Sequence, residues 1–140
     1  MATSAYLALD VGDVRIGVAI ANSEVRLPRP LTTLSNDENL WTNLTTIIQD
    51  HEIVSLVVGH PRGLNGQETE QTRKVEAFVQ TLITHTGLTV TMQDEAGTSI
   101  KAEAELRARR KPYEKADIDA LAATYILEDY LQEPGEVVHV

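Results

Sequence analysis

The chain has 140 residues with 42% hydrophobic residues and no cysteine, which suits one folded domain and excludes disulfides, iron–sulfur clusters, cysteine-ligated zinc and thiol nucleophiles. The 21 acidic and 12 basic residues give a formal net charge of −9, which argues against non-specific binding to nucleic acid. No apolar run reaches the roughly 18 residues of a membrane span and no signal-peptide pattern is present, so we expect a soluble, cytoplasmic protein.

The first elements predicted along the chain are three strands. Residues 5–11 form a nearly continuous apolar run, which is typical of a strand buried on both faces of a sheet. A Gly-Asp turn leads to an antiparallel return strand over residues 15–21. Two prolines restrict the segment that follows and favour an edge strand over residues 31–34.

Helices and strands alternate in the rest of the chain. The predicted elements are a helix that Asn36 or Asp37 caps, a strand over 53–58, a helix over 68–86, a strand over 88–92, a helix that Thr98 caps and that ends near Arg110, and a helix over 115–131. Residues 132–140 are expected to form a frayed tail. The order predicts one α/β domain over residues 1–140, with a five-stranded mixed sheet, antiparallel first and then parallel, flanked by about four helices.

Asp10 is the acidic residue least expected at its position. It lies within a run predicted to be buried, and because side chains alternate along a strand it shares a face with Tyr6 and Ala8. A carboxylate there costs several kcal/mol unless it is paired, hydrogen-bonded, protonated or bound to a metal. An Asp that caps the following turn is the alternative, and position alone leaves the two interpretations equal.

Two further acids follow the third predicted buried strand. Asp94 and Glu95 come after residues 88–92, where the sites of parallel sheets form. Adjacent acids after a strand are also ordinary loop residues, but the strand of Asp10 ends at the same edge of the sheet. Carboxylates brought to one edge from separate strands can chelate a hard divalent cation.

Asp119 is expected to join this group through helical geometry. It shares a helical stripe with small and apolar residues three, four and seven positions later, so it should face the sheet, whereas Asp117 should face solvent. The alternative is that both acids are present because the helix dipole favours negative charge near the start of a helix. This explains Asp117, but it does not explain why Asp119 should face the core without a partner. Carboxylates crowded at one edge repel one another, and divalent ions relieve that repulsion in a two-metal phosphodiester site.

Basic residues are candidates for contacts with phosphate. Arg62 lies in a glycine-rich loop over residues 59–66, which permits close approach of a ligand, although turn geometry alone also explains the glycines. Five of the twelve basic residues lie within 107–115, where a solvated helix end is the more common situation. The four histidines show no metal-ligand spacing and are expected at the surface. The residues expected to contact nucleic acid are Arg15, Arg62, Arg107, Arg110 and Lys111.

Four groups of short motifs carry the candidate acids and their surroundings. They are Leu9-Asp10-Val11-Gly12 with Arg15-Ile16-Gly17-Val18-Ala19, Val57-Val58-Gly59-His60-Pro61 with Asn65-Gly66, Asp94-Glu95 with Thr98-Ser99, and Asp119-Ala120-Leu121-Ala122-Ala123 with Ile126-Leu127 and Tyr130-Leu131. In order and spacing, over residues 6–131, this set resembles the YqgF/RuvX family of pre-16S rRNA nuclease and Holliday junction resolvase-like proteins.

The resemblance implies an RNase H-like fold and divalent-metal-dependent cleavage of structured nucleic acid. The expected role is processing of the 5′ end of the pre-16S ribosomal RNA in ribosome biogenesis. Carried over by motif position, Asp10, Glu95 and Asp119 are the catalytic and metal-binding residues, with Asp94 adjacent to the set. The implied cofactor is Mg²⁺ or Mn²⁺ in a two-metal site, and the implied partner is pre-16S rRNA or branched DNA and not a membrane; a homodimer is compatible with the sequence.

The chain departs from the family pattern beside these acids. Ala96 and Gly97 stand where an arginine and a large apolar residue are usual, and Asp13 and Val14 stand where threonine and lysine are usual. The missing cations favour a second interpretation, a catalytically impaired ribosome-assembly or nucleic-acid-binding module. A Holliday junction resolvase-like DNA nuclease is a third. An actin- or sugar-kinase-like ATPase is disfavoured, because those enzymes enclose the nucleotide between two lobes.

Overall fold

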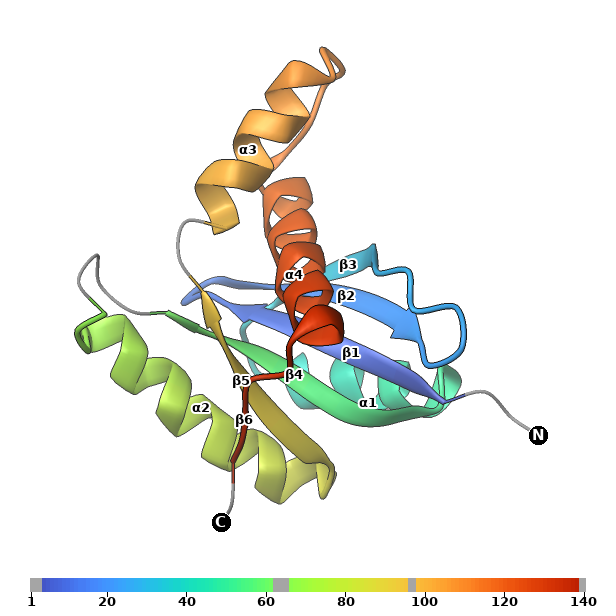
Figure 1. The fold of residues 1–140 in the computed structure, drawn as a ribbon. Coiled ribbons are helices and arrows are strands. Elements are labelled where there is room, and N and C mark those ends of the chain that lie inside the picture. The colour runs from blue at the N-terminus through green and yellow to red at the C-terminus, as the bar shows by residue number, and fades with distance from the viewer. Residues whose placement is uncertain (1–3, 62–65, 96–97, 139–140) are drawn as a thin grey trace.

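The computed structural model describes residues 4–61, 66–95 and 98–138. In these residues the chain forms one six-stranded mixed sheet and four helices (Figure 1), none of them long and apolar enough to cross a membrane. The strands are β1 (Ala5–Val11), β2 (Arg15–Asn22), β3 (Arg29–Ser35), β4 (Ile53–Pro61), β5 (Thr89–Glu95) and β6 (Glu136–Val137). The helices are α1 (Leu40–Asp50), α2 (Glu70–Thr86), α3 (Thr98–Ala108) and α4 (Lys115–Gln132).

The strand order in the sheet is β3-β2-β1-β4-β5-β6. Strands β1, β2 and β3 pair antiparallel, whereas β1, β4 and β5 pair parallel. The α/β mixed sheet and the sequence of its first five strands and four helices confirm the predicted architecture. β3 lies at the edge of the sheet, where Pro30 can be accommodated without an N–H to donate, next to a register shift.

The sheet has six strands instead of the five predicted. Glu136–Val137 pairs antiparallel with β5 at the second edge. The Gly135 amide donates to Gln93 Oε1 at 2.7 Å, and Gln93 Nε2 donates to the Glu133 carbonyl at 3.1 Å. In its described part, the expectation of a frayed tail over 132–140 was therefore wrong, because contacts with β5 order this segment.

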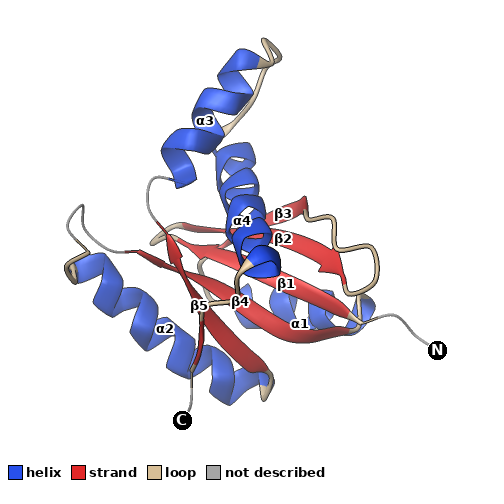
Figure 2. Cartoon of the chain, viewed as in Figure 1, coloured by secondary structure: helices blue, strands red, loops and turns tan. Residues whose placement is uncertain are grey.

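Different helices cover the two faces of the sheet (Figure 2), and the two faces bury different side chains. Leu7 and Leu9 of β1 belong to a large apolar cluster with α1 and α2. On the other face, Ala8 and Ala19 pack with α4, and these small side chains let the helix cross close to the sheet. Helix α3 packs on α4 through Leu106 and projects away from the sheet (Figure 1).

Two of the parallel strands run past the residues that the apolar pattern predicts. β4 continues to Pro61 and β5 to Glu95, because these last residues pair with each other in parallel register. Asp94 and Glu95 therefore lie inside a strand and not in a loop after it. This lengthening decides which way each acidic side chain points.

Two predicted helix caps were wrong. The N-cap of α1 is Asn39, not Asn36 or Asp37; the Asp37 carboxylate instead accepts the Asn39 amide at 2.9 Å. Thr98 is the first residue of α3, and its hydroxyl donates to the Glu95 carboxylate. The second of these differences bears directly on the candidate site.

Candidate active site

Three acidic side chains from distant parts of the chain line one cavity of about 250 Å³. Asp10 comes from β1, Glu95 from the last position of β5, and Asp119 from the first turns of α4. Arg15 and Ser99 line the same cavity. The structure thus brings together the three acids to which the motifs point, at the carboxyl ends of β1 and β5.

The absence of a side chain at Gly17 lets α4 approach the sheet at this point. Asp10 lies opposite Gly17 in the antiparallel pair of β1 and β2. A Cβ atom at Gly17 would overlap the main-chain carbonyl of Asp119 and lie 2.9 Å from the amide of Ala120. Glycine at this position therefore allows the first turns of α4, and Asp119 with them, to lie beside Asp10.

A second glycine makes room for the third acid. Gly59 lies in β4, between β1, which carries Asp10, and β5, which carries Glu95. A Cβ atom there would overlap Glu95 Oε2 and lie 2.6 Å from Ile126 Cδ1 of α4. From the first turn of α3, the Thr98 hydroxyl donates to Glu95 Oε1. The Glu95 side chain is therefore held on the α4 face of the sheet.

The Asp10 carboxyl has a strongly perturbed pKa. Burial raises this pKa most, and the negative charges of Glu95 and Asp119 raise it further, from 3.8 to about 8. Burial also raises the pKa of Glu95, while the hydrogen bond from Thr98 acts in the opposite direction. Two buried carboxyls that resist ionisation at a shared cavity indicate a place where positive charge is favoured.

A positive charge of the protein itself already lies at this cavity. Arg15, the first residue of β2, donates from Nε to Asp119 Oδ2 at 2.5 Å. The Arg15 side chain is 38% exposed and the Asp119 side chain 19% exposed, so the ion pair is open to solvent on one side. Arg15 was expected to contact nucleic acid, and in the structure its partner is a candidate metal ligand.

The chemistry of the cavity suits a hard cation, although its carboxylates are engaged by groups of the protein. Three carboxylates provide the oxygen ligands that Mg²⁺ and Mn²⁺ prefer. In the described part of the chain, however, no three Asp, Glu, His or Cys side chains are arranged to hold a metal ion together. Arg15 engages Asp119 and Thr98 engages Glu95. The residues fit in type, and their side chains would have to turn to ligate an ion.

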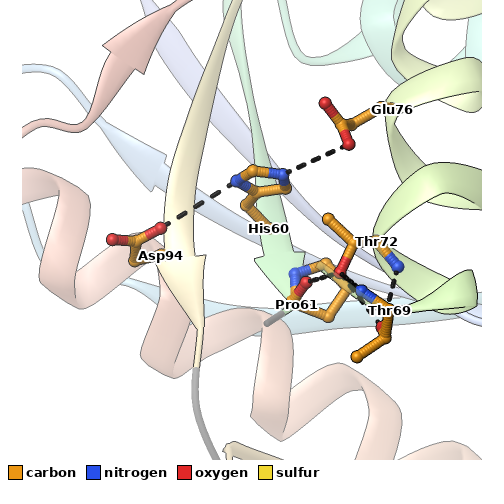
Figure 3. Close-up of polar contacts among 6 residues, drawn as sticks. All are labelled: His60, Pro61, Thr69, Thr72, Glu76 and Asp94. Carbon is orange, nitrogen blue, oxygen red and sulfur yellow. Dashed lines mark hydrogen bonds and ion pairs between the residues drawn. The ribbon is translucent and has the colours of Figure 1, made fainter. Parts of the chain in front are cut away.

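Asp94 does not join the three acids. Its side chain is 80% exposed and points to the opposite face of the sheet from Glu95, because the two residues alternate along β5. There its Oδ1 lies 3.9 Å from His60 Nδ1, and His60 Nε2 lies 3.9 Å from Glu76 Oε1 of α2 (Figure 3). The expectation that all four histidines are surface residues was wrong for His60, which the extended β4 buries.

Three other residues of the predicted nucleic-acid contact, Arg107, Arg110 and Lys111, lie away from the acids. Arg107 is exposed near the end of α3 and pairs with Glu103 at 3.5 Å. Arg110 and Lys111 are exposed where α3 gives way to the segment before α4, and within the described residues neither forms an ion pair. An 11-residue helix is about 16 Å long, so this end of α3 lies roughly that far from Thr98. Arg62 lies outside the described residues.

Two residues at the cavity were not assigned a role from the sequence. Gln71, in the first turn of α2, donates from Nε2 to the Val11 carbonyl at 3.2 Å. Ser99 follows Thr98 in the first turn of α3. For Ser99 the sequence holds a signal. Thr98, the first residue of α3, follows Glu95 by only three positions, and this short spacing places the first turn of α3 beside Glu95.

Comparison with known proteins identifies similar sequences over most of the chain. The model of the RuvX family, described as Holliday junction resolvase, matches residues 4–133. A Chloroflexus aurantiacus protein named "Putative pre-16S rRNA nuclease" is 40% identical over 129 residues, which cover 89% of this chain and 84% of that protein. A Sulfurihydrogenibium protein of the same name is 36% identical over 130 residues, covering 91% and 90%.

Solved structures are similar in fold at low sequence identity. The T. thermophilus RuvC in complex with a Holliday junction substrate superposes with a TM-score of 0.59 at 14% identity, covering 96% of this chain and 99% of that one. The fowlpox virus resolvase in complex with Holliday junction DNA gives a TM-score of 0.51 at 14% identity, covering 91% and 97%. At such identities the likeness concerns the fold alone, and it agrees with the predicted RNase H-like architecture.

Proposed function

Because the chain belongs to the RuvX family, we propose that it is a metal-dependent endonuclease that hydrolyses phosphodiester bonds in structured nucleic acid. Its curated relatives carry the name of pre-16S rRNA nucleases, and we take the 5′ end of the pre-16S ribosomal RNA as the substrate. The observation that carries the proposal is the cavity shared by Asp10, Glu95 and Asp119. A cytoplasmic location follows from this substrate.

The three acids are the proposed ligands of Mg²⁺ or Mn²⁺, in a site for two ions. Ions bound there would activate a water molecule and stabilise the leaving oxygen of the phosphodiester. Neighbouring residues position these ligands. Thr98 orients Glu95 through its hydroxyl, and Gly17 allows Asp119 to lie close to Asp10. With a pKa of about 8, Asp10 holds a proton near neutral pH, and a cation that binds there must displace this proton.

Phosphates of the substrate are proposed to contact basic residues at two places. Arg15 lies at the cavity itself. Arg107, Arg110 and Lys111 lie about one helix length from Glu95, so they would hold a neighbouring part of a folded substrate and not the scissile phosphate. Arg62, in the loop outside the described residues, is a further proposed contact.

Cleavage of a pre-16S rRNA 5′-end fragment by the wild-type protein and by Asp10→Asn tests the proposal. With Mg²⁺ or Mn²⁺ the wild type is expected to cut, and Asp10→Asn is expected to lower the rate about 10³-fold, because it removes a charged ligand. Asp117→Asn is the matched control, since Asp117 is exposed on the same helix as Asp119 and is expected to leave the rate unchanged. Equal rates for wild type and Asp10→Asn would overturn the proposed site.

Two other functions are decided by the same assay. A four-way DNA junction, run beside the RNA, tests the second candidate substrate, which the description of the family favours. A binding module without turnover is favoured by the two small residues at 96 and 97 and by the absence, in the described ranges, of three acids arranged around an ion. Binding of the RNA without cleavage at any concentration of Mg²⁺ or Mn²⁺ would select the binding module and overturn the endonuclease.

A further inference from the structure

The ion pair between Arg15 and Asp119 has a consequence for how a cation could bind. Asp119 is a proposed metal ligand, and its Oδ2 already accepts a hydrogen bond from Arg15 Nε at 2.5 Å. Both residues line the cavity of about 250 Å³ that also holds Asp10 and Glu95. A divalent cation at Asp119 would therefore lie within a few ångströms of a guanidinium that cannot lose its charge. The ion and Arg15 compete for the same carboxylate.

The surroundings of Arg15 fix its backbone but leave its side chain room to move. Its carbonyl accepts the Gly12 amide at 2.9 Å, and its position pairs with Ser35 in β3. Its side chain is 38% exposed, so it can turn toward solvent. The nearest acid along the chain, Asp13, is engaged by Lys74 at 3.5 Å. Arg15 can thus leave Asp119 without any change in the sheet.

We propose that Arg15 is a positioning residue that neutralises Asp119 until a divalent cation takes this ligand, and that the released guanidinium then contacts a phosphate of the substrate. The inference rests on the proposed nuclease function, because it assigns Asp119 to a cation. A guanidinium matches the geometry of phosphate oxygens through two parallel hydrogen bonds, which favours this second partner. In this exchange a positive charge lies beside Asp119 at every stage, so the negative charge of the crowded carboxylates is always partly neutralised.

A purely structural role for Arg15 makes a different prediction. If the ion pair only fastened α4 to β2, removing it would lower stability and weaken both cation binding and cleavage. If Arg15 competes with the cation, removing it improves cation binding and impairs cleavage. Opposite signs of the two effects therefore identify the competing role.

The test compares wild type with Arg15→Gln, with Arg29→Gln as the matched control at the far, exposed end of the sheet. Calorimetric titration with Mn²⁺ is expected to show about two- to fivefold tighter binding for Arg15→Gln, because a competing ion pair is removed. Cleavage of the RNA fragment at saturating Mn²⁺ is expected to fall about tenfold or more in the same variant, because a phosphate contact is lost. Arg29→Gln is expected to match the wild type in both measurements.

A measurement on the wild-type protein keeps the proposal testable even if Arg15→Gln does not fold. The Nε–H signal of Arg15 in ¹⁵N NMR is expected to be protected from water exchange by Asp119 and to lose this protection when Mg²⁺ is added. Unchanged protection at saturating Mg²⁺, or Mn²⁺ binding that is no tighter in Arg15→Gln, would overturn the inference. If the Arg15 tests fail while the wild type cleaves the RNA and Asp10→Asn does not, the role of Arg15 is wrong but the proposed nuclease function is supported.

Discussion

Burial and two neighbouring carboxyls all raise the pKa of Asp10, and this raised pKa makes the stability of the protein depend on pH. The folded protein keeps a proton on Asp10 up to about pH 8, whereas the unfolded chain releases it near pH 3.8. Between these values the folded state binds more protons than the unfolded state, so the free energy of unfolding falls as pH rises. The raised pKa of Glu95 adds a contribution of the same sign.

Asp10→Asn should remove the Asp10 part of this decline, because an amide has no proton to release in this range. In urea unfolding with a chelator present, the variant is expected to match the wild type near pH 4 and to exceed it at pH 8 by roughly 2–5 kcal/mol. Asp117→Asn is the control: Asp117 accepts the Glu114 amide at 2.8 Å at the start of α4, so this variant can differ from the wild type in stability but should keep the wild-type decline between about pH 4 and pH 8. Parallel stability curves for wild type and Asp10→Asn would contradict the raised pKa.

Single residues of the site were predictable where one element alone fixes the direction of a side chain. Alternation along β1 and the helical stripe of α4 predict on which face Asp10 and Asp119 lie, although position alone left Asp10 equally open to a turn-capping role. For Asp94 the same rule gives the opposite result, because β5 runs on through Glu95 and adjacent residues of a strand face opposite sides. The pairing of Arg15 with Asp119 was not predictable, since it depends on how α4 lies across β2.

At the scale of elements, the contact of α4 with β2 determines whether the acids meet. The helix lies so close at Gly17 that an added Cβ would overlap the Asp119 carbonyl. Moving either element would cost stability, because β2 is hydrogen-bonded to a strand on each side and α4 packs on the alanine-rich face of the sheet. The geometry of the site is therefore tied to the packing of one helix on one strand.

Gly17→Ala should accordingly damage stability and site together. A methyl group at this position forces α4 outward, and the expected loss in the free energy of unfolding is about 1–3 kcal/mol, with weaker Mn²⁺ binding because Asp119 moves away from Asp10. Gly87→Ala is the control: its φ of 67° makes alanine costly by roughly 1–2 kcal/mol, but it lies at the end of α2, away from the cavity. Mn²⁺ affinity unchanged in Gly17→Ala would contradict this account.

Elements were predictable where periodicity is strong, and their ends were not. The helical spacing of α2 and α4 and the apolar runs of β1 and β4 are local signals, and these elements lie where they were expected. The last residues of β4 and β5 are polar and become strand only because they pair with each other. β6 has two residues and no periodicity, so its pairing with β5 has no signal in the sequence.

For the whole molecule, the distribution of charge matters more than its sum. A net charge of −9 opposes binding to nucleic acid, yet five of the twelve basic residues lie within residues 107–115. α3 projects away from the sheet and carries the first of these residues at its far end (Figure 1). The positive charge is therefore presented at a distance from the acids, where it can attract a phosphate backbone without neutralising the cavity.

Arg110→Gln and Lys111→Gln should weaken binding of the RNA fragment without slowing the cut itself. Each lost phosphate contact is expected to reduce the slope of log K against log salt concentration by about 0.7–0.9, because fewer counterions are released. KM should rise while kcat stays near the wild-type value, since both residues lie about one helix length from Glu95. Arg29→Gln, which changes the net charge equally at the far end of the sheet, should leave the slope unchanged. If all three variants shift the slope alike, net charge and not the end of α3 governs binding, and the assignment of a contact there is wrong.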